Sequence, residues 1–241
     1  MVLKAKDSDG EIREAYRSVL LFLAGSYEDF VKNLDKLIPL MITGLTDDKD
    51  EVRKVSMRNV KVCIKQFGKR EPMGLIEPIM KMMFHKDSRV RASSSILMYQ
   101  LVKELDNDII KSQPKFMEIE TKHKILSSMF ILRHDQIDAV KSQAGQIWKS
   151  LIDNQLFILR QVIDTLIEIV FQIIQSKFDE LQEMGLSCMR GLVEKFGEKI
   201  VNRALDIFED KLNKVTDNSH TIGICRVMFN MVSAAPHRLL Q

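Results

Sequence analysis

The residues whose types and spacing are best suited to binding a partner are basic and lie between positions 53 and 91. This segment holds eleven lysines and arginines against three acidic residues, whereas the whole chain has a formal net charge of only +3. Arg58, Lys61 and Lys65 follow at steps of three and four, so on a helix they share one face. Such a ridge could dock an acidic protein surface or ribosomal RNA phosphates, with a plain solvated face as the alternative. No aromatic residue is interleaved, which disfavours stacking on single-stranded bases.

The histidines and cysteines show no spacing typical of catalysis or of a metal site. No histidine lies at i, i+4 from another histidine or cysteine, and zinc needs several such ligands to converge. The histidines are therefore expected at the surface or in turns, and the cysteines as reduced, buried apolar side chains. A glycine-rich phosphate loop and a nucleophile elbow are both missing. The sequence predicts no enzyme, no metal, no cofactor and no small-molecule substrate. These residues are His85, His123, His134, His220, His237, Cys63, Cys188 and Cys225.

Composition places these residues on helices. The chain has 241 residues, of which 45% are hydrophobic, with only 10 glycines and 5 prolines to make tight turns. Good helix formers dominate, so an all-α protein is expected. The most apolar stretch, residues 157–174, is interrupted by Arg160, Asp164 and Glu168 on one helical face, which indicates an amphipathic helix and not a membrane span. No signal peptide is recognisable at the N-terminus, and a cytoplasmic location is expected.

The helical pattern recurs along the chain with a period. Six anchor positions each start a run of apolar or small residues at offsets near 4, 8 and 11, which is one face of a helix. Successive anchors are 40, 38, 50, 41 and 41 residues apart. HEAT and armadillo repeats, which stack helix pairs into α-solenoids, recur at about 40–47 residues. The anchors are Ile12, Val52, Val90, Val140, Leu181 and Ile222.

The period predicts a right-handed α-solenoid of HEAT-type units over residues 1–241, with the anchors on the second helix of each pair. Pro39 and Pro78 fall midway along first helices, and Gly68 and Gly197 are expected as left-handed C-caps of second helices. The longest spacing indicates an inter-repeat loop at 104–116. Because neither end of the chain looks like a polar cap, it is expected to be a fragment of a longer array.

Several segments, taken in order, resemble one family. They are "IETKHKILSSMFILRHD" (119–135), "VKSQAGQIWKSLIDN" (140–154), "LVEKFGEKIVNRALDIFEDKL" (192–212) and "IGICRVMFNMV" (222–232), while 37–102 is more loosely similar. In this order the segments are similar to the large general-control translational activators, HEAT-repeat proteins of the amino-acid starvation response. The resemblance implies a scaffold that binds ribosomes and, through its C-terminal HEAT region, the RWD domain of the kinase that phosphorylates initiation factor 2.

The resemblance also selects the candidate partner-binding residues. Family members carry Asn-Thr-Pro-Arg-x-x-Arg where this chain has "DNQLFILRQ", so Arg160 keeps the second arginine and Phe157 replaces the first. Lys149 and Arg160 are the expected kinase-binding residues, and Trp148 is expected either as packing support or as a partly exposed interface anchor. Two alternatives stay open: a ribosome- or RNA-binding scaffold acting through segment 53–91, and an unrelated HEAT adaptor such as a transport receptor or a phosphatase subunit.

Overall fold

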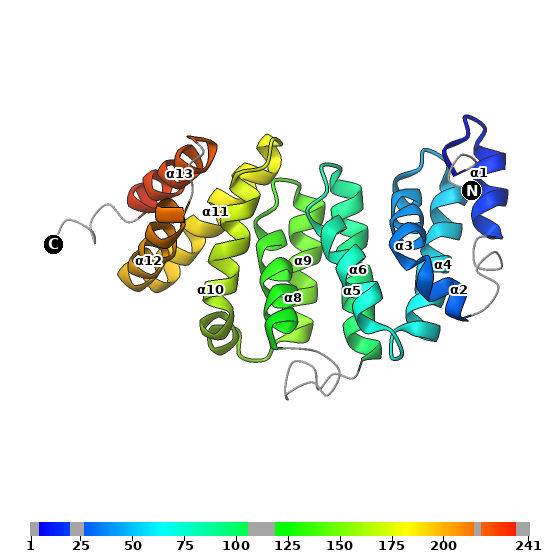
Figure 1. Ribbon diagram of the computed structural model, residues 1–241, viewed down its shortest axis with the longest axis horizontal. Coiled ribbons are helices and arrows are strands. Elements are labelled where there is room, and N and C mark those ends of the chain that lie inside the picture. The colour runs from blue at the N-terminus through cyan, green and yellow to red at the C-terminus, as the bar shows by residue number, and fades with distance from the viewer. Residues whose placement is uncertain (1–4, 20–26, 106–118, 215–217, 235–241) are drawn as a thin grey trace. The chain divides into compact units, whose positions relative to one another are not determined.

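The computed structural model describes residues 5–19, 27–105, 119–214 and 218–234, which form helices joined by turns (Figure 1). No strand occurs among these residues, and the predicted all-α class is confirmed. The chain divides into two compact units, Met1–Lys122 and His123–Gln241. Most of the predicted loop at 104–116 lies outside the described residues, and its first residue, Glu104, ends a helix.

The first unit consists of stacked helix pairs. Helix α3 packs on α4 and α5 packs on α6, while α3 also contacts α5, and α4 contacts both α1 and α6. First helices therefore lie beside first helices and second helices beside second helices, as expected for helical repeats. Pro39 lies inside α3 and Pro78 inside α5, as predicted. The elements are α1 (Gly10–Ser18), α2 (Tyr27–Lys32), α3 (Leu34–Thr43), the 3-10 turn η3 (Gly44–Thr46), α4 (Asp50–Phe67), α5 (Pro72–Met83) and α6 (Ser88–Glu104).

The second unit repeats this arrangement. Helix α10 packs on α11 and α12 on α13, and the pairs stack through contacts of α10 with α12 and of α11 with α13. Helices α8 and α9 meet where the Phe130 and Trp148 rings pack edge to face with centroids 5.3 Å apart. The elements are α8 (Ile119–Ile131), which begins just before the unit boundary, η4 (Leu132–His134), α9 (Asp138–Leu151), α10 (Gln155–Ile174), α11 (Asp179–Phe196), α12 (Glu198–Lys214) and α13 (Asn218–Ala234).

The turn before each second helix repeats down to individual atoms. Five residues before each of the first five anchors, a polar side chain accepts a hydrogen bond from the backbone N–H two residues later, at 2.9 to 3.2 Å. This local bond fixes the chain in a turn just before the helix starts. The sequence analysis noted acidic turns but missed this fixed position. The accepting residues are Asp7, Asp47, His85, Asp135 and Ser176.

The residue after the anchor closes the same turn from the other side. Arg53 donates to the carbonyls of Asp47 and Asp48 at 2.6 and 2.8 Å. Arg13 and Arg91 donate to the carbonyls five and six residues before them, and Gln182 donates to the carbonyl six residues before it. These bonds satisfy carbonyls at the turn that no helix uses. The recurrence of one bonding pattern at one spacing confirms the predicted period.

Two details of the predicted repeats are wrong, and a third is right only in part. Ile12 and Ile222 are 38% and 55% exposed, and α13 instead buries a face that includes Val227 and Met231. Gly68 is not a left-handed cap, because its φ is −53° and its N–H bonds to the Ile64 carbonyl as in a continuing helix. Gly197 does have a positive φ of 64°, as expected for a glycine between two helices, although its ψ of −144° lies outside the left-handed helical region.

Candidate docking surfaces

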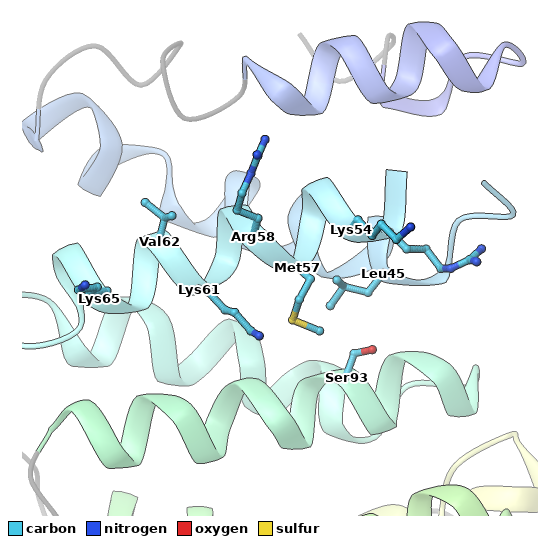
Figure 2. Close-up of a pocket in the computed structure, with 9 residues that line it drawn as sticks. Leu45, Lys54, Met57, Arg58, Lys61, Val62, Lys65 and Ser93 are labelled. Atoms are coloured by element: carbon cyan, nitrogen blue, oxygen red, sulfur yellow. The ribbon is translucent and has the colours of Figure 1, made fainter. Parts of the chain in front are cut away.

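The predicted basic ridge lies on α4. Arg58, Lys61 and Lys65 are all exposed, and none of their side chains forms an ion pair or a hydrogen bond within the described ranges of the chain. Figure 2 shows Lys61 and Met57 projecting from α4 toward the helix that carries Ser93, while Arg58 projects to the opposite side. The ridge therefore presents three uncompensated positive charges along the second half of α4.

The cations at the start of α4 have partners. Asp50 in the first turn binds Arg53 at 3.0 Å and Lys54 at 2.5 Å. The hydrogen bond from Lys54 lowers the pKa of Asp50, and the same bond raises the pKa of Lys54. Asp50 also lies at the positive end of the helix dipole, which it stabilises. On α4, the positive charge that is free to meet a partner is thus that of the ridge.

A shallow groove runs along the ridge. Its volume is about 570 Å³, and it is lined by the ridge together with apolar side chains. Leu45 is buried at its floor, and Met57 and Val62 are half-buried. Ser93 of α6 closes the far side (Figure 2). We call this the α4 groove, with the complete lining Leu45, Arg53, Lys54, Met57, Arg58, Lys61, Val62, Lys65 and Ser93.

A second groove, in the other unit, contains Arg160. It has a volume of about 770 Å³ and lies where α10, the end of α11 and α12 meet. Arg160, Lys195 and Lys199 are exposed on it and form no ion pair within the described parts of the chain. We call this the α10–α12 groove, with the complete lining Arg160, Ile163, Asp164, Lys195, Phe196, Lys199, Ile200 and Arg203.

One ion pair crosses the α10–α12 groove. Arg203 of α12 binds both carboxylate oxygens of Asp164 of α10 at 2.6 Å, a bidentate geometry that fixes both side chains. This hydrogen bonding lowers the pKa of Asp164 and raises that of Arg203. Because Asp164, the carboxylate among the described lining residues, is already occupied, the other three cations dominate the charge of that lining.

The other two predicted partner-binding residues lie elsewhere. Trp148 is fully buried, in edge contact with Phe130 and beneath the Arg133 guanidinium at 5.7 Å. Its position agrees with packing support and leaves no surface for an interface anchor. Lys149 is exposed at the end of α9 but does not line the α10–α12 groove. The structure therefore brings Arg160 together with Lys195 and Lys199, and not with the two residues named beside it.

The sequence analysis missed the basic residues of α11 and α12. Lys195 and Lys199 flank Gly197, and the break between helices there was predicted. Their position beside Arg160 depends on the packing of α10 against α12, which periodicity does not reveal. The sequence feature that could have indicated this site is the pair of lysines on either side of Gly197.

The thiols of Cys63 and Cys188 are buried as packing groups, and His134 is half-buried. Burial raises the pKa of Cys63 to about 12 and that of Cys188 further, so both thiols stay protonated. Cys225 is exposed, contrary to the expected burial, because α13 turns a different face inward. Burial, with help from Arg133 and Lys141, lowers the pKa of His134 to about 4. In the described part of the chain, no three metal-binding side chains converge.

Together, the helix pairs and grooves define an α-helical repeat protein with a cationic groove in each compact unit. Among the described residues, no helix is both apolar enough and long enough to cross a bilayer. Solved structures that align along the chain include a designed armadillo repeat protein, at 13% identity and a TM-score of 0.38, covering 95% of this chain and 97% of that one. A TM-score this low carries no argument about the fold, so the fold class is inferred from the observed helix pairs.

The predicted family resemblance is confirmed by curated relatives, although no family model matches the chain. The chain is 27% identical over 254 residues to the eIF-2-alpha kinase activator GCN1 of Dictyostelium discoideum, which covers 95% of the chain. It is 22% identical over 243 residues to the protein of that name from Saccharomyces cerevisiae, covering 93%, and 21% identical over 234 residues to the human stalled ribosome sensor GCN1, covering 89%. The chain spans about a tenth of the length of these relatives.

Proposed function

We propose that this chain is a non-catalytic scaffold segment that acts in translational control by supporting activation of a protein kinase. The observation that carries this proposal is the similarity to two proteins named as kinase activators, along 93 to 95% of the chain. A stack of helix pairs with open grooves suits a protein that holds partners. Coupling to the ribosome belongs to the longer protein of which this segment would be part, and its place of action would be the cytoplasm.

The partner proposed for the second unit is the RWD domain of the starvation kinase. Arg160, kept from the family pattern, lies in the α10–α12 groove beside Lys195 and Lys199. Three exposed cations without ion pairs in the described residues favour an acidic patch on the partner. The apolar side chains of Ile163, Phe196 and Ile200 give the same groove an area that a partner can cover. Lys149 would add a peripheral contact, and Trp148 would support the fold beneath it.

The test is direct binding of the isolated RWD domain to the full chain. Calorimetry should detect a complex with a Kd below about 50 µM. A variant carrying R160E and K199E should bind at least about tenfold more weakly, because two attractions become repulsions. Lys177→Glu, an exposed lysine between α10 and α11 that does not line the groove, is the matched control and should bind as the parent does. Absence of binding by a folded parent chain would remove direct docking from the proposal.

A further inference from the structure

The α4 groove has chemistry that the proposed kinase site does not use. It lies in the first unit, on elements η3, α4 and α6. Its rim carries the ridge of Arg58, Lys61 and Lys65, and none of these three has a counter-charge within the described ranges. Leaving like charges side by side destabilises a helix slightly. A partner that supplies carboxylates would remove this repulsion.

The spacing of the ridge limits the shape of that partner. Arg58 and Lys65 are seven residues apart, which is about 10 Å along a helix axis. Acidic side chains on a second helix at steps of three and four repeat over the same length. An acidic helix lying over α4 can therefore meet Lys61 on the side of Ser93 and Arg58 on the other side, with Lys65 further along the helix (Figure 2). A compact anion such as a single phosphate would reach only part of the ridge.

The apolar residues that line the groove favour a protein over a nucleic acid as its partner. Leu45 and Met57 line the groove on the Ser93 side of the cations, whereas Val62 projects on the same side of α4 as Arg58 (Figure 2). Methionine is flexible and polarisable, so it adapts to a range of apolar side chains. An RNA backbone would leave these apolar side chains uncovered, and no aromatic side chain on which a base could stack is among the described residues that line the groove. Only a partner with both carboxylates and apolar side chains covers the whole groove.

We propose that the α4 groove docks an acidic amphipathic helix of another protein. Its apolar side chains pack on Met57 and the edge of Leu45, and its carboxylates pair with Arg58, Lys61 and Lys65. Charge speeds the encounter and sets the orientation, while the apolar contacts slow dissociation. This surface is separate from the α10–α12 groove, so it does not depend on kinase docking.

A designed peptide tests the proposal with the full chain. A labelled helical peptide of about 16 residues, with glutamates at steps of three and four beside a row of leucines, is titrated by fluorescence anisotropy. A second peptide keeps every glutamate and replaces the leucines by glutamine. A single-stranded and a double-stranded RNA of similar charge are the nucleic-acid probes.

The expected result is binding of the first peptide only. Reversing the ridge with R58E, K61E and K65E should weaken this binding at least about tenfold. Met57→Gln should weaken it with little change in salt dependence, because it removes an apolar contact and no charge. The matched control reverses Lys69, Lys81 and Lys86 to glutamate, three exposed lysines of the same unit that do not line the groove, and should leave affinity within about twofold of the parent.

Three outcomes would overturn the proposal. Equal binding of the leucine-free peptide would reduce the groove to a non-specific positive patch. RNA binding that is tighter than peptide binding and is lost in the ridge variant would assign the ridge to nucleic acid. Absence of peptide binding by the folded parent would leave the groove without the proposed partner. None of these results bears on RWD binding, which uses other residues and another probe.

Discussion

At the scale of single residues, Asp47 links two repeats. Its carboxylate caps its own turn by accepting from the Lys49 N–H, and it also binds the Arg13 guanidinium of the preceding repeat at 2.8 Å. Burial acts to raise the pKa of Asp47, but the hydrogen bonds from Arg13 and Lys49 outweigh it and lower the pKa to about 2. One carboxylate thus closes a turn and joins neighbouring second helices α1 and α4.

Asp47→Asn should lower the free energy of unfolding by about 1–3 kcal/mol at neutral pH, because the bond to Arg13 loses its charge. The folded-state pKa lies below the ordinary value of 3.8, so this stabilisation is complete above about pH 4 and declines as the pH falls toward 2. Denaturant titrations at about pH 7 and about pH 3 should therefore show a smaller difference at the lower pH. Glu51→Gln, at an exposed position in the first turn of α4, is the control. A difference that does not change with pH would contradict the argument.

Trp148 gives a second prediction at this scale. Its ring is fully buried and its Nε1–H has no hydrogen-bond partner in the structure. Trp148→Ala should cost about 3–5 kcal/mol of stability by leaving a cavity. Trp148→Phe keeps the contact with Phe130 and removes the unpaired N–H, so it should cost only about 1 kcal/mol. Thermal unfolding measures both, and RWD binding by W148F should equal that of the parent. A folded W148F that loses binding would make Trp148 an interface residue after all.

At the scale of elements, the break between α11 and α12 depends on Gly197. Its φ of 64° and ψ of −144° lie in a region that side chains with a Cβ rarely adopt. Gly197→Ala should lower the free energy of unfolding by about 1–3 kcal/mol. Gly145→Ala is the control, because a Cβ there meets nothing within 4 Å and the residue lies inside α9. That change should stabilise the chain by about 0.5–1 kcal/mol. Chemical denaturation of the two variants should move in opposite directions, and equal shifts would contradict the argument.

The elements also show what the sequence could and could not reveal. Period and helix pairing followed from apolar spacing, since Val52, Val90 and Val140 are all buried on second helices. Spacing says nothing about which neighbour a side chain meets. The neutralisation of Arg53 and Lys54 by Asp50 depends on rotamers at one helix start. Which residues lie beside Arg160 depends on how α10 and α12 pack. Both are consequences of three-dimensional contact, and a linear pattern does not contain them.

At the scale of the whole molecule, a cationic groove with apolar side chains lies in the described residues of each compact unit. The two grooves share a chemistry but differ in one respect. In the α10–α12 groove, the bidentate ion pair of Arg203 with Asp164 connects two helices. The ridge of the α4 groove has no such pair in the described residues. We therefore expect the two grooves to bind different partners. The α10–α12 groove, which the ion pair makes rigid, should favour a folded domain, and the α4 groove should favour a helix.

This difference predicts separable binding. The R160E and K199E variant should lose RWD affinity by at least about tenfold and keep peptide affinity, and the ridge variant should show the converse. Both interactions should weaken as salt rises from about 50 to about 300 mM, because the cations involved are exposed. Titrating each partner in the presence of the other, with both variants as controls, measures any coupling. If both variants weaken both partners equally, the grooves do not act as distinct sites, and the effect is one of net charge alone.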